Sequence, residues 1–132
     1  MTPQVPTVLV AEDDSIIRQS LAFRLILAGF DVITAVDGRD AEDVADHQHI
    51  DAAILDVKMP RRDGFEVCQH IRTRGSEIPI LLLNSAEEGV LRTYLGVLTK
   101  VVGGTHYMTK PYDARVLAMT LQEALSKEKV RV

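Results

Sequence analysis

The stretch Asp51-Ala52-Ala53-Ile54-Leu55-Asp56 is a short apolar run with a carboxylate at each end. A run of this kind, without alternating polar residues, is typical of a strand that is buried on both faces of a parallel sheet. It predicts a buried strand over residues 51–55, with Asp56 fixed at its carboxyl end. The remaining elements can be assigned outward from this strand.

Similar apolar runs recur along the chain and alternate with segments of helical periodicity. The other expected strands cover residues 7–11, 31–35, 79–83 and 106–109, and the expected helices cover 15–28, a stretch opening at 38, 65 to about 75, 86–102 and 113 to about 127. Five strands that are each followed by a helix predict an α/β fold, a doubly wound parallel sheet with helices on both faces.

The size and composition indicate one domain. The chain has 132 residues, which fit a single domain over 1–132 with a core at about 7–126, and 46% of them are hydrophobic. The net charge is −4, and the lack of a long basic run argues against direct nucleic-acid binding. With one cysteine, no signal-peptide pattern and no membrane-length apolar run, we expect a cytoplasmic location without a membrane partner.

Polar residues gather where the predicted strands end. Ligands of such sheets bind at the carboxyl ends of the strands, where the strand order reverses. The residues at these ends are Glu12, Asp13 and Asp14 after the first strand, Asp56 after the third, Asn84 and Ser85 after the fourth, and Lys110-Pro111 after the fifth. Their joint placement predicts one functional site at this edge.

The acidic residues of this group indicate a divalent cation. Neighbouring carboxylates resist being ionised together, and Mg²⁺ removes that cost while sharing phosphate oxygens. Glu12, Asp13 and Asp56 supply a suitable set of oxygens. Asp56 can hold a phosphoryl group as an acyl phosphate, and Lys110 can pair with the added charge.

Several of these residues also have a purely structural interpretation. The acidic run is a common helix start, with Asp14 or Ser15 as the N-cap. A single aspartate after a strand is usually a turn residue. On the third helix, Cys68 is expected to be a small packing residue, and His70 a surface residue one turn from Glu66.

The sequence resembles the receiver domains of two-component response regulators, the CheY-like superfamily, from Val8 to about Leu125. The resemblance rests on three motifs: VLVAEDD at residues 8–14, DVKMP at 56–60 with DG at 63–64, and KPY at 110–112. It implies the flavodoxin-like fold, a single (βα)5 domain with the strand order 2-1-3-4-5.

The resemblance also implies a role for each matching residue. Asp56 matches the phosphoacceptor, and Lys110 matches the lysine that pairs with the phosphoryl group. The implied Mg²⁺ ligands are Asp13 and Asp56 directly, Glu12 through water, and the backbone carbonyl of Lys58. Tyr107 falls where the family has an aromatic residue that rotates inward on activation.

The sequence departs from the family in two places. A Thr or Ser normally ends the fourth strand, whereas this chain has Asn84 there and Ser85 next. Either Asn84 replaces the hydroxyl or a bulge brings Ser85 into its place, and the Ser-Ala pair at 85–86 favours Ser85. The segment between Ser85 and Lys110 is also longer than expected. Its wide apolar face, over 86–102, either packs on the sheet or forms an unusual interface.

The implied function is that of a phosphorelay response regulator. Asp56 would receive a phosphoryl group from a sensor histidine kinase or a phosphotransfer protein. The face made by the fourth helix, fifth strand and fifth helix would then change, and the same face can form a homodimer. We expect a signalling phosphoacceptor that assists its own phosphorylation and dephosphorylation rather than an enzyme.

The alternative is a degenerate receiver that binds a protein partner without phosphorylation. A flavodoxin is excluded because the acidic run at residues 12–14 would repel a flavin phosphate. The chain ends soon after its last helix, which favours a stand-alone regulator. The cognate kinase and the output partner are not encoded in these motifs.

Overall fold

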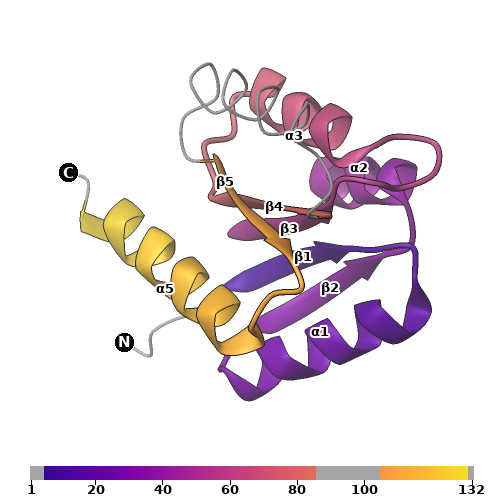
Figure 1. Ribbon diagram of the computed structural model, residues 1–132. Coiled ribbons are helices and arrows are strands. Elements are labelled where there is room, and N and C mark those ends of the chain that lie inside the picture. The colour runs from indigo at the N-terminus through magenta and orange to yellow at the C-terminus, as the bar shows by residue number, and fades with distance from the viewer. Residues whose placement is uncertain (1–4, 86–104, 131–132) are drawn as a thin grey trace.

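The computed structural model describes residues 5–85 and 105–130, which form a parallel sheet between two layers of helices (Figure 1). The elements are β1 (Thr7–Ala11), α1 (Ser15–Leu27), β2 (Asp31–Ala35), α2 (Gly38–His47), β3 (Ala52–Asp56), α3 (Gly64–Thr73), β4 (Ile80–Ser85), β5 (Thr105–Lys110) and α5 (Ala114–Val130). The sheet order is β2-β1-β3-β4-β5, which confirms the predicted flavodoxin-like topology. The helix expected over 86–102 lies outside the described residues.

Within residues 5–85 and 105–130, two helices pack on each face of the sheet. Helices α2 and α3 pack on one face, and α1 and α5 pack on the other (Figure 1). Successive residues of a strand point to opposite faces, so Leu9 and Leu55 join the α2–α3 core while Val10 and Ile54 join the α1–α5 core. All four side chains are fully buried, which explains why the strand sequences lack polar alternation.

Three strands extend beyond their expected ends. Strand β3 includes Asp56 itself, β4 continues to Ser85, and β5 continues to Lys110. Pairing explains these differences, because Asp56 lies opposite Leu83 and Ser85 lies opposite Lys110 in the ladder. Backbone pairing with a neighbour can extend a strand past its apolar residues, which the hydrophobic pattern does not report.

Aspartate side chains cap the N-termini of α1, α2 and α3. The Asp14 carboxylate accepts hydrogen bonds from the backbone N–H groups of Ile16 and Ile17, so Asp14 and not Ser15 is the N-cap of α1. Asp37 caps α2, and Asp63 caps α3 in a reciprocal capping box with Glu66. All three caps follow carboxyl ends of strands or their loops, so helix starts and strand ends share one side of the sheet.

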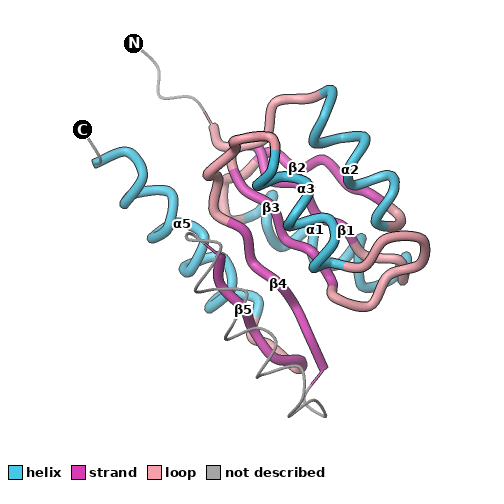
Figure 2. The backbone as a smooth tube through the Cα atoms, turned by 90° about the horizontal axis from the view of Figure 1, so that it is seen from above, coloured by secondary structure: helices cyan, strands magenta, loops and turns pink. Residues whose placement is uncertain are grey.

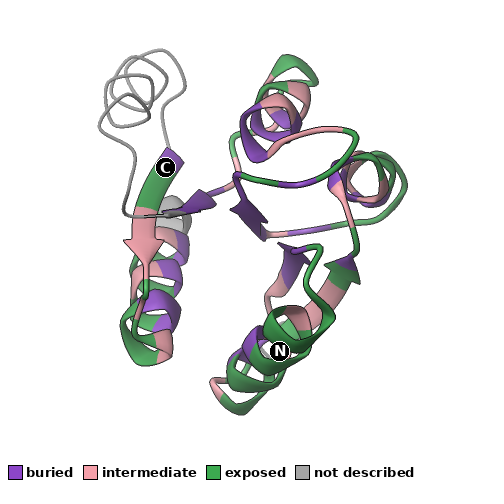
Figure 3. Ribbon diagram, turned by 45° about the vertical axis from the view of Figure 1, so that its right-hand side comes forward, coloured by how far each residue is buried: buried purple, intermediate pink, exposed green. Residues whose placement is uncertain are grey.

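Burial follows the layers closely. Buried residues occupy the central strands β1, β3 and β4 and the inner faces of the helices, whereas the edge strands β2 and β5 and the outer helix faces are mostly intermediate or exposed (Figure 3). Strand β5 is the edge strand beside β4 (Figure 2). Within 5–85 and 105–130, no helix has both the length and the apolar character needed to cross a membrane.

Candidate functional site

The acidic side chains predicted to form a site lie together. Glu12 follows β1, Asp13 is next in the chain, and Asp56 ends the neighbouring strand β3. One carboxylate oxygen from each of these three residues lies within 4.8 Å of the other two. Glu12 is 3% exposed and Asp56 is 5% exposed, whereas Asp13 is exposed.

Lys110 brings a positive charge to this cluster from the far side of β4. Its Nζ atom lies 3.1 Å from Asp56 Oδ1 and 3.9 Å from Glu12 Oε2. The Lys110 side chain is 29% exposed, so its ammonium reaches a buried pair while keeping contact with solvent. The Lys110–Pro111 peptide bond is cis.

Lys110 does not fully offset the effect of burial and neighbouring charge on the carboxyl groups of the cluster. Burial of Glu12, together with its hydrogen bond to Asp56 and the Asp56 charge, raises the pKa of Glu12 to about 8, and Lys110 only partly opposes this. Burial, followed by the Glu12 and Asp56 charges, also raises the pKa of Tyr112. Glu12 Oε2 is buried without a hydrogen-bond partner within the described ranges.

These properties fit a hard divalent cation. The three donors are carboxylate oxygens from Glu12, Asp13 and Asp56, and Mg²⁺ binds oxygen ligands at short, regular distances. A cation would supply a partner for the Glu12 oxygen and offset the burial cost and the carboxylate repulsion that together raise the Glu12 pKa. The exposed Asp13 leaves the cluster open to solvent, so water and phosphate oxygens can reach it.

The end of β4 shows no bulge. Pairing with β5 is continuous from Leu83 opposite Met108, through Asn84 opposite Thr109, to Ser85 opposite Lys110. Asn84 therefore stands directly after the residue that pairs with Asp56, and the interpretation that a bulge brings Ser85 into this position is wrong. Asn84 is 4% exposed, and its Oδ1 atom has no hydrogen-bond partner within the described residues.

Tyr107 lies on β5, three residues before Lys110, as the sequence predicted. Its side chain is 47% exposed, so the ring points outward in this structure. Tyr107 pairs with Leu82 in the ladder, one residue before Leu83 and two before Asn84. The ring is therefore placed where a change at the end of β4 could alter its packing.

Lys58 lies in the loop between β3 and α3, two residues beyond Asp56 and exposed. The loop closes tightly at its base, because the Gly64 N–H donates to the Val57 carbonyl at 2.9 Å. A Cβ atom at residue 64 would lie 2.6 Å from the Asp56 carbonyl oxygen. Only glycine fits here without displacing the backbone of the candidate phosphoacceptor, which gives the Asp-Gly pair at 63–64 a physical reason.

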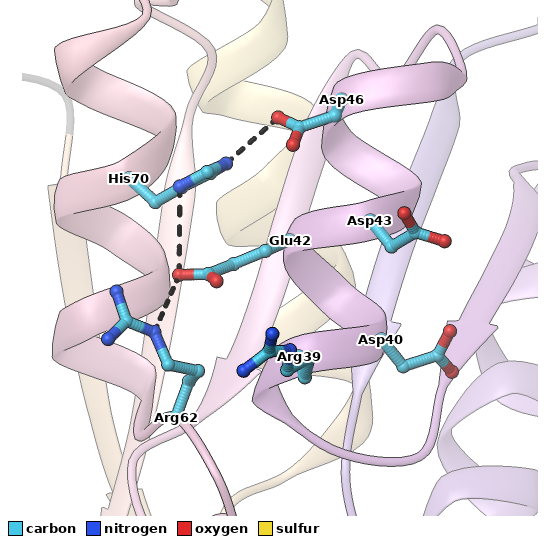
Figure 4. Close-up of a pocket in the computed structure, with 7 residues that line it drawn as sticks. All are labelled: Arg39, Asp40, Glu42, Asp43, Asp46, Arg62 and His70. Atoms are coloured by element: carbon cyan, nitrogen blue, oxygen red, sulfur yellow. Dashed lines mark hydrogen bonds and ion pairs between the residues drawn. The ribbon is translucent and has the colours of Figure 1, made fainter.

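Sequence reasoning missed a polar network between α2 and α3. His70 is not a free surface residue: its Nε2 atom lies 2.8 Å from Asp46 and its Nδ1 atom 3.7 Å from Glu42 (Figure 4). The His70 hydrogen bond lowers the pKa of Asp46. Arg62 also pairs with Glu42, at 3.0 Å. The sequence feature that could have indicated this network is the pair of acidic residues Glu42 and Asp46, four residues apart on α2. Their partners, however, come from a separate segment of the chain.

Cys68 is a packing residue, as predicted. It is fully buried in the α2–α3 core, and this burial raises the pKa of its thiol. Its Sγ atom lies 3.8 Å from the Thr105 hydroxyl at the start of β5. A neutral, enclosed thiol of this kind is poorly suited to redox chemistry.

The fold and the site define a protein class, and the sequence matches it directly. This chain belongs to the response regulator receiver domain family, which matches residues 8–122. The chain is 37% identical over 120 residues to the response regulator MprA of Mycolicibacterium vanbaalenii, covering 91% of this chain and 50% of that protein. It is 34% identical over 123 residues to the alkaline phosphatase synthesis transcriptional regulatory protein PhoP of Bacillus subtilis, covering 93% and 50%.

Solved structures agree with this family. The chemotaxis response regulator CheY4 of Vibrio cholerae superposes with a TM-score of 0.78 at 34% identity, covering 92% of this chain and 99% of that one. The receiver domain of the sensor histidine kinase PA1611 of Pseudomonas aeruginosa, which has a magnesium ion coordinated in its active-site cleft, gives 0.80 at 26% identity, covering 93% and 99%. The chain spans about half the length of the curated relatives it matches.

Proposed function

We propose that this receiver domain is phosphorylated on Asp56 by a phosphohistidine of a sensor histidine kinase or a phosphotransfer protein. The observation that carries the proposal is the buried Asp56 carboxylate, 3.1 Å from the Lys110 ammonium and within 4.8 Å of the Glu12 and Asp13 oxygens. An Asp56 oxygen attacks phosphorus as the bond from phosphorus to the donor imidazole breaks. The product is an acyl phosphate, and the imidazole leaves.

Mg²⁺ is the metal we assign to the acidic cluster. Asp13, Asp56 and the Lys58 carbonyl would hold it directly, and Glu12 would hold it through water. When bound, the metal supplies positive charge to the phosphoryl oxygens during transfer. The carboxylate geometry and the raised Glu12 pKa support this assignment, as does the magnesium ion named for the PA1611 receiver domain.

Lys110 and the end of β4 would respond to the new charge. The Lys110 ammonium moves from the bare Asp56 carboxylate to a phosphoryl oxygen, which is a stronger charge-assisted partner. The Asn84 amide donates a further hydrogen bond. The shift of β4 lets Tyr107 turn inward, and a partner that prefers the altered face shifts the population toward it.

We further propose that the chain acts in the cytoplasm as one receiver domain over residues 1–132, not as a turnover enzyme. The face made by β5 and α5 would bind the output partner or a second copy; the fourth helix expected beside it lies outside the described residues. Asn84 in place of a hydroxyl favours a second candidate, a degenerate receiver that binds its partner without phosphorylation. The two candidate functions differ in whether Asp56 becomes phosphorylated.

Intact-mass spectrometry after incubation with acetyl phosphate and Mg²⁺ tests the proposal. We expect one phosphoryl adduct on the parent chain and none on Asp56→Asn or on a sample with excess chelator. Circular dichroism of each sample confirms that it is folded. If a folded parent chain given a donor that phosphorylates a control receiver acquires no adduct, the degenerate receiver is the better description.

A further inference from the structure

The loop that joins β3 to α3, residues 57–63, is fastened to α2 at its tip. The Gly38 N–H at the start of α2 donates to the Pro60 carbonyl at 3.4 Å. A Cβ atom at residue 38 would overlap the carbonyl oxygen of Arg62, so loop and helix backbones are in direct contact. The loop carries Lys58, whose carbonyl is the proposed metal ligand, so α2 helps to set that carbonyl's position.

Arg62 makes this attachment electrostatic as well. Its Nε atom lies 3.0 Å from Glu42 Oε2 on α2 (Figure 4). Its Nη1 atom lies 3.0 Å from Glu66 Oε2 on α3. The other oxygen of Glu66 accepts the Asp63 N–H at 3.1 Å in the capping box. One guanidinium thus ties the loop to α2 and to the first turn of α3, which its rigid fork of donors makes possible.

Arg61 provides a second attachment beside the first. Its backbone has φ of 72°, a left-handed conformation that is uncommon for residues other than glycine. Its Nε atom lies 3.0 Å from Asp37 Oδ2, while Asp37 Oδ1 caps α2 by accepting the Asp40 N–H. The conformation is therefore held by the same helix start that Gly38 places against the loop.

We propose that Arg62 is a positioning residue for the metal site. Through Glu42 and Glu66 it fixes the loop that carries the Lys58 carbonyl, and it thereby raises the affinity for Mg²⁺. This inference rests on the function proposed above. The base of the loop is already fixed by Gly64, so a displaced tip must move the residues between the two attachments.

An ion pair that only holds α2 and α3 together would not be expected to change the affinity for Mg²⁺. Further along α2 and α3, Asp46 already pairs with His70 and with Arg74 Nε, both at 2.8 Å. Arg74 therefore offers a matched control, because its ion pair joins the same two helices without touching the loop. If Arg62 acts only by holding the two helices together, Arg74→Met should weaken Mg²⁺ binding to the same degree as Arg62→Met.

Isothermal titration calorimetry with MgCl₂ on the full, unphosphorylated chain tests this. We compare the parent, Arg62→Met, Arg62→Lys and Arg74→Met, and check folding by circular dichroism and urea unfolding. We expect Arg62→Met to raise the Mg²⁺ Kd about tenfold, the lower end of effects seen for outer ligand supports. Arg62→Lys should fall between the two, and Arg74→Met should match the parent. Phosphorylation of Arg62→Met should recover at saturating Mg²⁺.

Several results would overturn the proposal. One is a Kd for Arg62→Met within about twofold of the parent, and another is an equal loss in Arg74→Met. If Arg62→Met does not fold, Arg62→Lys decides, and a parent-like Kd in that folded variant overturns it. A parent that binds no Mg²⁺ and gains no adduct would instead refute the proposed function itself, and this inference with it.

Discussion

The Lys110 Nζ atom lies 3.1 Å from Asp56 Oδ1, although the two residues stand on strands that are separated by β4. The long lysine side chain spans the end of β4 and meets a carboxylate that is almost fully buried. The same ammonium lies 3.9 Å from Glu12. One cation therefore serves two buried carboxyl groups, and the site is most stable when a further positive charge or a proton is present.

Replacing Lys110 by Met should destabilise the chain in the absence of Mg²⁺. The change leaves the Asp56 carboxylate buried without its cation, and with Lys110 partly exposed we expect a loss of about 1–2 kcal/mol. Urea unfolding at pH 7 measures this. Asp56→Asn in the Lys110→Met background should recover most of the loss, and equal stability of Lys110→Met and the parent would contradict the prediction.

Without Mg²⁺, the free energy of unfolding should fall as pH rises from 4.5 to about 8. The Glu12 pKa is 4.5 in an exposed chain and about 8 in the folded one, so between these values the folded chain holds a proton that the unfolded chain has released. Below pH 4.5 Glu12 is protonated in both states and does not change the free energy of unfolding with pH. Above pH 8 it is ionised in both states, and the loss of stability due to Glu12 has reached its full size. We expect urea unfolding at several pH values in this range to show that the free energy of unfolding falls less steeply with pH in Glu12→Gln than in the parent.

Mg²⁺ should stabilise the parent chain and not Asp13→Asn. A ligand that binds only the folded state stabilises it by about 2.7 kcal/mol at 100 times its Kd. Thermal unfolding with and without Mg²⁺ measures the shift. Asp31→Asn, which changes an exposed carboxylate away from the cluster, is the matched control and should keep the response of the parent. A full shift in Asp13→Asn would argue against the assigned ligand.

Gly64→Ala should be much more harmful than Gly75→Ala. At residue 64 a Cβ atom would press on the Asp56 carbonyl, and overpacking of this kind costs about 1–3 kcal/mol. At residue 75 the Cβ meets nothing within 4 Å, and only the positive φ opposes it. We expect Gly64→Ala alone to lose the phosphoryl adduct in mass spectrometry. Equal adduct formation in both variants would show that the Asp56 backbone tolerates displacement.

Asn84→Thr should stabilise the chain. The Asn84 Oδ1 atom is buried and unpaired within the described residues, and an unmet buried polar group costs about 1 kcal/mol or more. A smaller threonine removes that oxygen and restores the hydroxyl that the family usually has. Urea unfolding should show a gain of about 1 kcal/mol. A loss instead would mean that the rest of the Asn84 amide makes a contact worth more than the orphaned oxygen costs.

The sequence alone was sufficient for the order of the elements within residues 5–85 and 105–130 and for the three acidic residues of the cluster. Apolar runs such as 51–55 predicted buried strands, and parallel strands must place their carboxyl ends at one edge of a sheet. That rule brought Glu12, Asp56 and Lys110 together before any distance was known. The hydrophobic pattern of the sequence was less informative about where β3, β4 and β5 end, because pairing between strands extends them past their apolar residues.

Only the tertiary structure decided which residue follows Leu83 in the site and what holds the β3–α3 loop. Whether a strand contains a bulge depends on its neighbour, and the unbroken ladder between β4 and β5 put Asn84 rather than Ser85 there. The ion pair between Arg62 and Glu42 joins segments 20 residues apart. Local periodicity carries no record of such pairs, because they form only when α2 packs beside the β3–α3 loop.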